Sequence, residues 1–370
     1  MPAAQKLAEL SVRAIRCTGV EVPMSYALGT SRGTITRAPL LLLDLYTAEG
    51  VPGCAYLWCY FPAVMPAIAS ILGEVERATK GERVAPADLW GKLAERFALI
   101  GVQGIVRMAM AGFDMAAWDA LAKAAGLPLV ELLGSARKPI RAYNSCGLGL
   151  MSSPGELADE AERLLAGGFR AIKLRLGYPT LADDLAALHA VKKRVGAEVA
   201  VMVDYNQALG LAEARARGRA LDREGIYWLE EPIRHDDYAG NAALARELET
   251  PLQLGENFSE SAAMARALEA QACDYVMPDL ERIGGVTGWQ RAAALAAIHR
   301  VEMSSHLYPE ISVHLLAATP TGHFLEYMDW ADKIVAAPLA IVDGFAIAPD
   351  RPGNGLLWNP QAVAKYRTAP

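Results

Sequence analysis

The sequence has no paired-cysteine motif and no surplus of positive charge. Its five cysteines are scattered, odd in number and without a CxxC pair, which argues against a disulfide framework or a zinc ribbon and favours a reducing cytoplasm. The formal net charge of −6 argues against binding to a nucleic-acid backbone. Hydrophobic residues make up 53% of the 370 residues and charged residues 21%, so the chain is not disordered and can form a large core.

We expect neither a signal peptide nor a membrane span from this sequence. Its start, MPAAQKLAEL, has no basic region followed by an apolar run. Residues 50–73 carry no charge and are long enough to cross a bilayer. However, Pro52, Gly53, Pro62 and Pro66 interrupt this segment, and Pro62 divides it into a short strand and a helix start. We therefore expect a soluble protein with no membrane partner.

The pattern of hydrophobic residues divides the chain into two parts. Residues 9–19, 39–47 and 54–60 predict a three-stranded meander, and helical patterns follow at 63–78, 87–98 and 105–125. From about residue 139, short apolar strands alternate with alanine-rich helices. The expected strands cover 140–145, 170–176, 199–205, 226–231, 252–256, 274–279, 301–306 and 323–328. Eight such strands predict an α/β fold with a closed parallel barrel. We predict a first domain over 1–137, a barrel over 138–335 and a tail over 336–370 that returns to the first domain.

Most expected barrel strands end in an ionisable residue. These residues are Asp204, Glu230, Glu256, Asp279, His306 and Glu326, and successive members are 26, 26, 23, 27 and 20 residues apart. That spacing is the length of one strand–helix unit, so the side chains would recur at the C-terminal mouth of the barrel, where active sites of such barrels lie.

Three of these acids, Asp204, Glu230 and Glu256, would come from adjacent strands. Three converging carboxylates need a cation, and an all-oxygen ligand set suits Mg²⁺ with water and substrate in the remaining positions. Alternatively, each acid caps the following helix or pairs with an arginine. The repeated spacing favours the metal site.

Two further sets of residues indicate chemistry at the mouth. Lys173 and Arg175 are two apart on a strand, so they share a face, and two cations facing a barrel interior imply an anion there. The alternative is a solvated strand end. His306 ends one strand and Asp279 the strand before it. A carboxylate beside an imidazole fixes its tautomer and raises its pKa, which suits a general base.

Several segments resemble the mandelate racemase branch of the enolase superfamily. They are AIKLRLGYP, VMVDYNQ, WLEEP, LGEN, MPDLERIGGVTGW, MSSHLYPEISVHLLAATPT, FLEY and, in the first domain, GFDMAAWDAL. The resemblance covers nearly the whole chain in the same order. It implies an α+β capping domain, made of the N-terminal part and the C-terminal tail, over a (β/α)7β modified TIM barrel. It also implies Mg²⁺ as cofactor, a small 2-hydroxycarboxylate as substrate and a homo-oligomer.

The resemblance further implies roles for single residues. His306 would be the base on one face of the substrate, with Asp279 as its partner. Glu326 would be the acid that hydrogen-bonds the substrate carboxylate, and Lys173 would contact that carboxylate. The implied substrate contacts are Ser145 near the carboxylate, Asn206 near the 2-hydroxyl, the specificity loop from Leu28 to Arg37, and the pocket residues Trp58 and Tyr60.

The chain departs from this family pattern at Arg175, which stands where the family's KxK motif has its second lysine. In a racemase that lysine is the second base, whereas arginine stays protonated at neutral pH. Arg175 can still neutralise and hydrogen-bond an enediolate. The loop also carries Arg32 and Arg37, which suggest a polar or second-carboxylate substituent on the substrate unless they are simply solvated.

These observations predict an enzyme, a lyase or an isomerase, that removes the α-proton of a 2-hydroxycarboxylate. Because Arg175 replaces the second base, acid-sugar dehydration is slightly favoured over true mandelate-type racemisation, which remains the alternative. A further alternative is a ligand-binding relative that has lost turnover.

Overall fold

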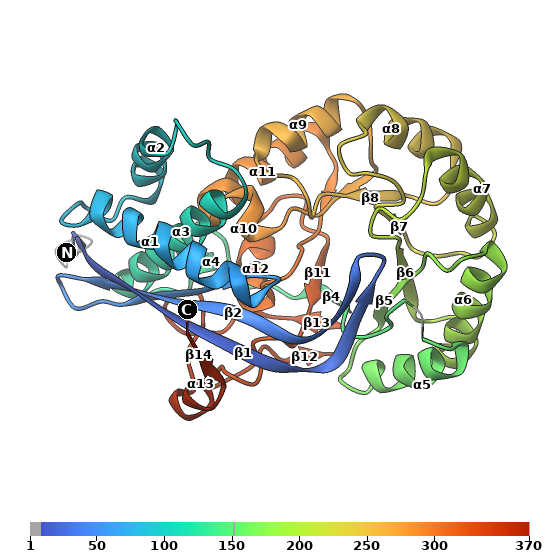
Figure 1. The fold of residues 1–370 in the computed structure, drawn as a ribbon, viewed down its shortest axis with the longest axis horizontal. Coiled ribbons are helices and arrows are strands. Elements are labelled where there is room, and N and C mark those ends of the chain that lie inside the picture. Colours follow the sequence, from blue (N-terminus) through green and yellow to red (C-terminus); the bar gives the residue numbers. More distant parts are fainter. Residues whose placement is uncertain (1–8, 151, 370) are drawn as a thin grey trace.

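The computed structural model describes residues 9–150 and 152–369. A four-stranded antiparallel sheet lies in the first part of the chain, the cap. The sheet order is β14-β1-β2-β3, with β1 at Val12–Thr30, β2 at Gly33–Thr47, β3 at Gly53–Trp58 and β14 at Arg367–Thr368. The predicted meander is therefore present, but β1 and β2 are longer than predicted. They continue to a turn at 31–32, with Leu28 paired to Ile35. The segment expected as a specificity loop is thus the tip of a β-hairpin, which reaches across to the barrel (Figure 1).

The cap helices cover this sheet. They are α1 (Met65–Thr79), α2 (Pro86–Arg96), α3 (Gly104–Ala125) and the short α4 (Leu129–Leu132), after a 3₁₀ turn at Pro62–Val64. Helix α3 is buried along most of its length and packs against β3 on one side and against barrel helices on the other. A Cβ on Gly53 would lie 1.9 Å from the carbonyl oxygen of Ala116, so only glycine permits this approach of β3 to α3.

The second part of the described chain is a barrel of parallel strands. Its strands are β4 (Ile140–Asn144), β5 (Ala171–Arg175), β6 (Ala200–Asp204), β7 (Leu229–Glu230), β8 (Leu252–Leu254), β9 (Tyr275–Val276), β10 (Glu302–Met303) and β11 (Phe324–Tyr327). Neighbours pair in chain order from β4 to β10, and β11 pairs with β4. Backbone hydrogen bonds from His323 to Met303 and from Ser305 to Phe324 join β10 to β11. The predicted (β/α)7β arrangement is confirmed.

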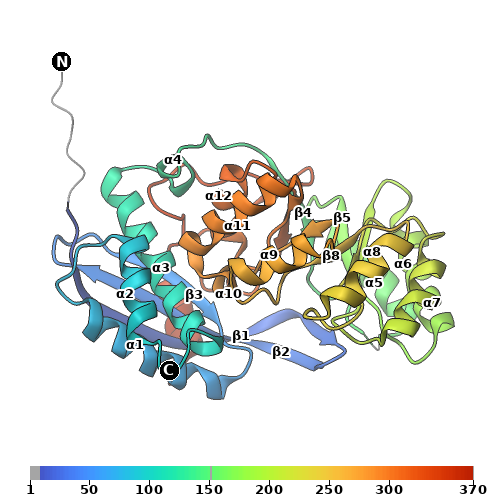
Figure 2. The same cartoon turned by 90° about the horizontal axis from the view of Figure 1, so that it is seen from above.

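Helices surround the strands on the outside of the barrel (Figures 1 and 2). They are α5 (Pro154–Leu165), α6 (Leu181–Val195), α7 (Leu211–Leu221), α8 (Tyr238–Glu247), α9 (Ser261–Glu269), α10 (Leu280–Ile283), α11 (Gly285–His299) and α12 (Pro309–Ala318). On β5, Ala171 joins a small interior cluster with Met202 and Trp228, whereas Ile172 and Leu174 belong to the main core beneath the helices. This alternation places Lys173 and Arg175 on the interior face, as predicted.

The C-terminal tail contacts both parts of the molecule. A hairpin of β12 (Ile341–Val342) and β13 (Phe345–Ala346) pairs with barrel strand β4, which the sequence did not predict. After α13 (Pro360–Tyr366), strand β14 pairs with β1 of the cap. Within the described ranges, no helix combines the length and hydrophobicity needed to cross a bilayer.

Candidate active site

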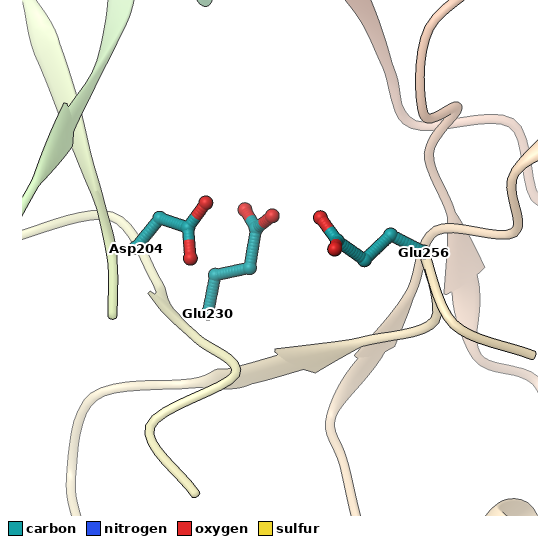
Figure 3. A group of neighbouring side chains, drawn as sticks. All are labelled: Asp204, Glu230 and Glu256. Atoms are coloured by element: carbon teal, nitrogen blue, oxygen red, sulfur yellow. The ribbon is translucent and has the colours of Figure 1, made fainter. Parts of the chain in front are cut away.

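Three carboxylates meet at the C-terminal mouth of the barrel (Figure 3). Asp204 and Glu230 are the last residues of β6 and β7, and Glu256 follows β8 by two residues. One oxygen from each lies within 4.8 Å of the others, and the picture shows the three groups directed toward one another. This arrangement follows from parallel strands whose carboxyl ends meet at one edge.

Two of the three acids lack sufficient positive charge for their burial. Burial raises the pKa of Glu230 to about 8, helped by the negative charge of Asp204 and opposed by Lys173. Burial likewise raises the pKa of Asp204. For the third, Glu256, burial raises the pKa, but His306, Arg282 and Lys173 lower it by more. Three converging carboxylates, two of which have raised pKa values, fit a hard divalent cation, which would favour the ionised form of each acid.

Lys173 stands beside this cluster. Its Nζ lies 2.9 Å from Glu230 Oε1, 2.9 Å from Glu326 Oε1 and 3.3 Å from Asp204 Oδ2. Burial lowers the pKa of Lys173, but these carboxylates raise it by more, so its pKa lies well above the ordinary value. Lys173 is therefore a fixed ammonium group next to the three carboxylates.

His306 is oriented by Asp279. The imidazole Nδ1 lies 2.6 Å from Asp279 Oδ2, while the other carboxylate oxygen accepts the backbone N–H groups that begin α10. The His306 Nε2 atom lies 3.3 Å from Glu256 Oε2 and 3.8 Å from Glu326 Oε2. Burial lowers the pKa of His306, but Glu326, Glu256 and Asp279 raise it by more, to about 9. Nε2 thus faces the carboxylate cluster, and with this pKa it must lose its proton at neutral pH before it can act as a base.

Glu326 is a hydrogen-bond acceptor in this arrangement. Its Oε1 accepts from Lys173 Nζ, and its Oε2 accepts from the backbone N–H of Leu307 at 2.9 Å. Burial raises the pKa of Glu326, but Lys173 and His306 lower it by more, so its pKa lies below the ordinary range. Glu326 must therefore gain a proton before it can donate to a substrate.

Arg175 is turned toward the loop that follows β4. Its Nη1 donates to the carbonyl oxygens of Ser145 at 3.1 Å and Gly147 at 2.8 Å, and its Nη2 lies 3.2 Å from Ser145 Oγ. Its Nε–H is buried and has no acceptor among the described atoms. Arg175 is thus a fixed cation with one unused donor, and Ser145 lies fully buried beside it.

Asn206 connects a metal-ligand candidate to the cap. Its backbone N–H and its Nδ2 both donate to Asp204, at 2.7 and 2.9 Å. Its carbonyl oxygen accepts from Ser31 in the hairpin turn, and Arg32 donates to the neighbouring Gln207. In contrast, Arg37 is exposed, and its Nε lies 3.5 Å from Glu21 Oε2.

A cavity of about 400 Å³ lies between the cap and this cluster. Of the residues singled out in the sequence, those that line it are Leu28, Arg32, Trp58, Tyr60, Lys173, Arg175, Asp204, Asn206, Glu256, His306 and Glu326. Glu230, Asp279, Ser145 and Arg37 are not among the lining residues. A more open hollow of about 820 Å³ lies beside Trp358 on the cap, where it has no carboxylate among its lining residues, so we assign the chemistry to the smaller cavity.

Two family models match the chain. "Enolase C-terminal domain-like" covers residues 156–362, and "Mandelate racemase / muconate lactonizing enzyme, N-terminal domain" covers residues 13–134. The chain belongs to the mandelate racemase and muconate lactonizing enzyme branch of the enolase superfamily. The family resemblance stated from the sequence is confirmed.

Solved structures and a curated relative agree with this membership. An enolase from alpha proteobacterium BAL199 with bound magnesium is 43% identical, with a TM-score of 0.95 over 97% of this chain and 100% of that chain. An enolase from Bradyrhizobium complexed with magnesium and mandelic acid is 39% identical, with a TM-score of 0.92 over 98% and 100%. The L-talarate/galactarate dehydratase of Salmonella typhimurium is 30% identical over 89% of this chain and 82% of its own length.

Other curated relatives from the superfamily are cycloisomerases and an epimerase. Together with the dehydratases they are lyases and isomerases. The prediction that this chain is an enzyme of one of these two classes is therefore confirmed.

The enolase-superfamily site contains residues that sequence reasoning missed. Arg282 lines the cavity and donates to Asn257 Oδ1 and, at 3.0 Å, to the carbonyl oxygen of Glu256. Asn257 also contacts the buried Glu231. Trp330 stacks on Trp58 with ring centroids 4.0 Å apart. Two of these residues directly follow a proposed ligand in the chain, in WLEEP and LGEN, which was the only available signal.

Backbone strain is concentrated around the same mouth. Non-glycine residues with left-handed backbone are found there at Tyr60, Leu148, Asn206, Gln207, Glu231, Leu307 and Tyr308. Such conformations are unfavourable for residues with a Cβ and persist where surrounding contacts hold them, most often at functional sites.

Proposed function

We propose that this protein is an Mg²⁺-dependent enzyme that removes the α-proton of a 2-hydroxycarboxylate through an enediolate. Asp204, Glu230 and Glu256 would hold the metal, and His306 would be the base. The observation that carries the proposal is the approach of His306 Nε2 to within 3.3 Å of Glu256, which places a base beside the carboxylate cluster. The magnesium in related enolase structures supports the choice of cation.

Each residue of the site would have a separate role in this reaction. Removing a proton next to a carboxylate creates a dianion, so the site must stabilise charge that develops during the reaction. Bound Mg²⁺ would act as a Lewis acid on the substrate carboxylate. Lys173 presents its ammonium group to the same carboxylate, and Asp279 keeps the proton of His306 on Nδ1 so that Nε2 can accept the α-proton. Glu326 donates a hydrogen bond to the substrate carboxylate once it carries a proton.

Arg175 favours dehydration as the outcome. A racemase needs a second group that exchanges a proton on the opposite face, and a guanidinium does not release one at neutral pH. In dehydration, His306 takes the α-proton, the enediolate expels a 3-hydroxyl, and His306 returns the proton to that leaving group as water departs. The resulting enol becomes a 2-keto acid. This sequence uses one base only.

The cavity wall gives some support to a second candidate, racemisation of a 2-hydroxy acid with an apolar substituent. The stacked Trp58 and Trp330, together with Leu28 and Ile35, form an apolar wall on the cap side. An apolar substituent would pack against this wall, whereas hydroxyl groups would find partners only at the other cap-side residues, Thr30, Arg32, Thr34 and Tyr60. The binding of mandelic acid by the Bradyrhizobium relative is consistent with such a wall.

A substrate screen tests the proposal. Acid sugars and both enantiomers of mandelate would be incubated in D₂O with Mg²⁺ and followed by proton NMR for loss of the α-proton signal and for 2-keto product. We expect exchange in at least one acid and keto product from a 2,3-dihydroxy acid. If ligands bind but no α-proton exchanges, the chain is a binding protein and the proposal is wrong.

A further inference from the structure

Glu281 and Tyr308 form a buried hydrogen-bonded pair next to His306 and Asp279, and neither has a role in the chemistry described above. Glu281 Oε2 accepts the Tyr308 hydroxyl and, at 3.2 Å, the backbone N–H of Trp58. The same N–H lies 3.0 Å from the Tyr308 oxygen. All three residues are at most 1% exposed. The Glu281 carboxylate and the Tyr308 hydroxyl therefore both accept from the backbone N–H of Trp58 in the cap.

The pair sits directly on the two segments that carry the base and its partner. Glu281 is two residues after Asp279, and its backbone N–H donates to Asp279 Oδ1 at 2.9 Å. Tyr308 is two residues after His306, and the intervening Leu307 donates to Glu326. A contact between Glu281 and Tyr308 thus ties the segment of Asp279 to the segment of His306.

The turn after His306 has an unfavourable backbone conformation that other contacts must hold. Leu307 and Tyr308 both have left-handed backbone, with φ of 55° and 52°. Two successive non-glycine residues in this region are unfavourable unless other contacts hold them. The hydroxyl at the end of the Tyr308 side chain donates to Glu281 and accepts from the backbone N–H of Trp58. These two hydrogen bonds fix the Tyr308 side chain and so help to hold the turn.

The third partner, Trp58, belongs to the wall of the substrate cavity. It ends β3 and stacks on Trp330. The pair therefore connects the cap wall to both segments of the base. We infer that Glu281 and Tyr308 are positioning residues that hold the His306 imidazole at a fixed distance from the Trp58 wall, and hence from the substrate. This inference rests on the proposed role of His306.

The first test compares Tyr308→Phe with Tyr56→Phe in the full chain. Tyr56 is a matched control because its hydroxyl also donates to a buried carboxylate, Glu310, at 2.8 Å, and its ring contacts that of Tyr308. However, Glu310 lies in α12, beyond the turn at 307–308, and no described hydrogen bond joins Tyr56 to Glu281 or Tyr308. With ¹⁵N-labelled histidine and Mg²⁺ alone, we expect the Nδ1–H resonance of His306 to move upfield or broaden in Tyr308→Phe and to stay in place in Tyr56→Phe.

The kinetic readout uses the 2-hydroxy acid from the screen that the parent exchanges fastest. We expect kcat to fall about tenfold in Tyr308→Phe with KM changed by less than about threefold, as for loss of one hydrogen bond that matters in the transition state. Equal kcat, equal KM and an unmoved resonance in folded Tyr308→Phe would overturn the inference. If the parent exchanges no acid, the proposed function fails, and the resonance alone still decides whether the pair positions His306.

A second pair of variants covers the case in which Tyr308→Phe does not fold. The carbonyl oxygen of glutamine can accept both donors, so Glu281→Gln should stay within about threefold of the parent in kcat. Glu281→Leu fills a similar volume but accepts no hydrogen bond, so it should lose about tenfold. Equal kcat in these two variants would show that the hydrogen bonds do not position the base.

Discussion

Replacing Arg175 with lysine tests whether Arg175 is the reason that only one face of the substrate exchanges its α-proton. In the parent, deuterium from D₂O should enter only the enantiomer whose α-hydrogen faces His306. A general base contributes roughly 10²–10⁴-fold, so exchange of the other enantiomer should be slower by at least about 10². In Arg175→Lys, burial and the neighbouring Lys173 should lower the pKa of the new amine toward neutrality. We expect exchange of the slow enantiomer to rise by about tenfold or more.

The change to lysine should also remove hydrogen bonds that hold the loop after β4. Arg175 donates three hydrogen bonds to Ser145 and Gly147. At about 0.5–1.5 kcal/mol each, their loss would weaken the anchoring of the loop by about 1.5–4.5 kcal/mol. That loop contacts the cap, because the backbone N–H of Leu150 donates to Gly29 at 3.0 Å. A rise in KM should therefore accompany the gain of exchange.

Arg175→Gln is the matched control, since glutamine also loses most of these bonds but cannot act as a base. The assay is proton NMR in D₂O on each pure enantiomer of an accepted 2-hydroxy acid, with parent and both variants. Only Arg175→Lys should exchange both enantiomers and produce some racemate. If the parent already exchanges both at comparable rates, Arg175 is not the barrier and racemisation becomes the better proposal. If the lysine and glutamine variants behave alike, the second face has no base in either.

Three further predictions concern the metal, the base and stability. Glu230→Gln removes one of the converging charges and should weaken Mg²⁺ binding, measured by calorimetry, by roughly 100-fold or more. Unchanged affinity, or activity that survives EDTA, would contradict the metal site. His306→Asn should abolish α-proton exchange, by more than roughly 10²–10⁴-fold, while Mg²⁺ binding is kept; substantial residual exchange would point to Lys173 as base. Burial, with a contribution from Asp332, raises the pKa of Glu310 from 4.5 to about 7, so the folded protein keeps a proton that the unfolded chain loses. The stabilising contribution of Glu310 is therefore complete below about pH 4.5 and lost as pH rises through 7, a change of about 3 kcal/mol. Urea unfolding at pH 4.5 and 8 should show this loss in the parent and not in Glu310→Gln, and parallel pH profiles would refute it.

Much of the site was accessible from the sequence because barrel geometry is repetitive. Each strand–helix unit has nearly the same length, so residues at successive strand ends return to the same edge. Asp204, Glu230 and Glu256 could be grouped on that basis alone. The two-residue period of a strand likewise placed Lys173 and Arg175 on one face before any contact was known.

Contacts between the cap and the barrel depended on tertiary structure. Trp58 and Glu281 are 223 residues apart, and no local period relates them. The direction in which a charged head group turns is also a tertiary property. The sequence predicts that Arg175 faces the barrel interior, but only the folded loop at 145–147 shows its guanidinium bound to backbone carbonyls. Local periodicity thus determined which residues reach the mouth of the barrel, whereas the packing of distant segments decided how each is oriented and what charge it carries.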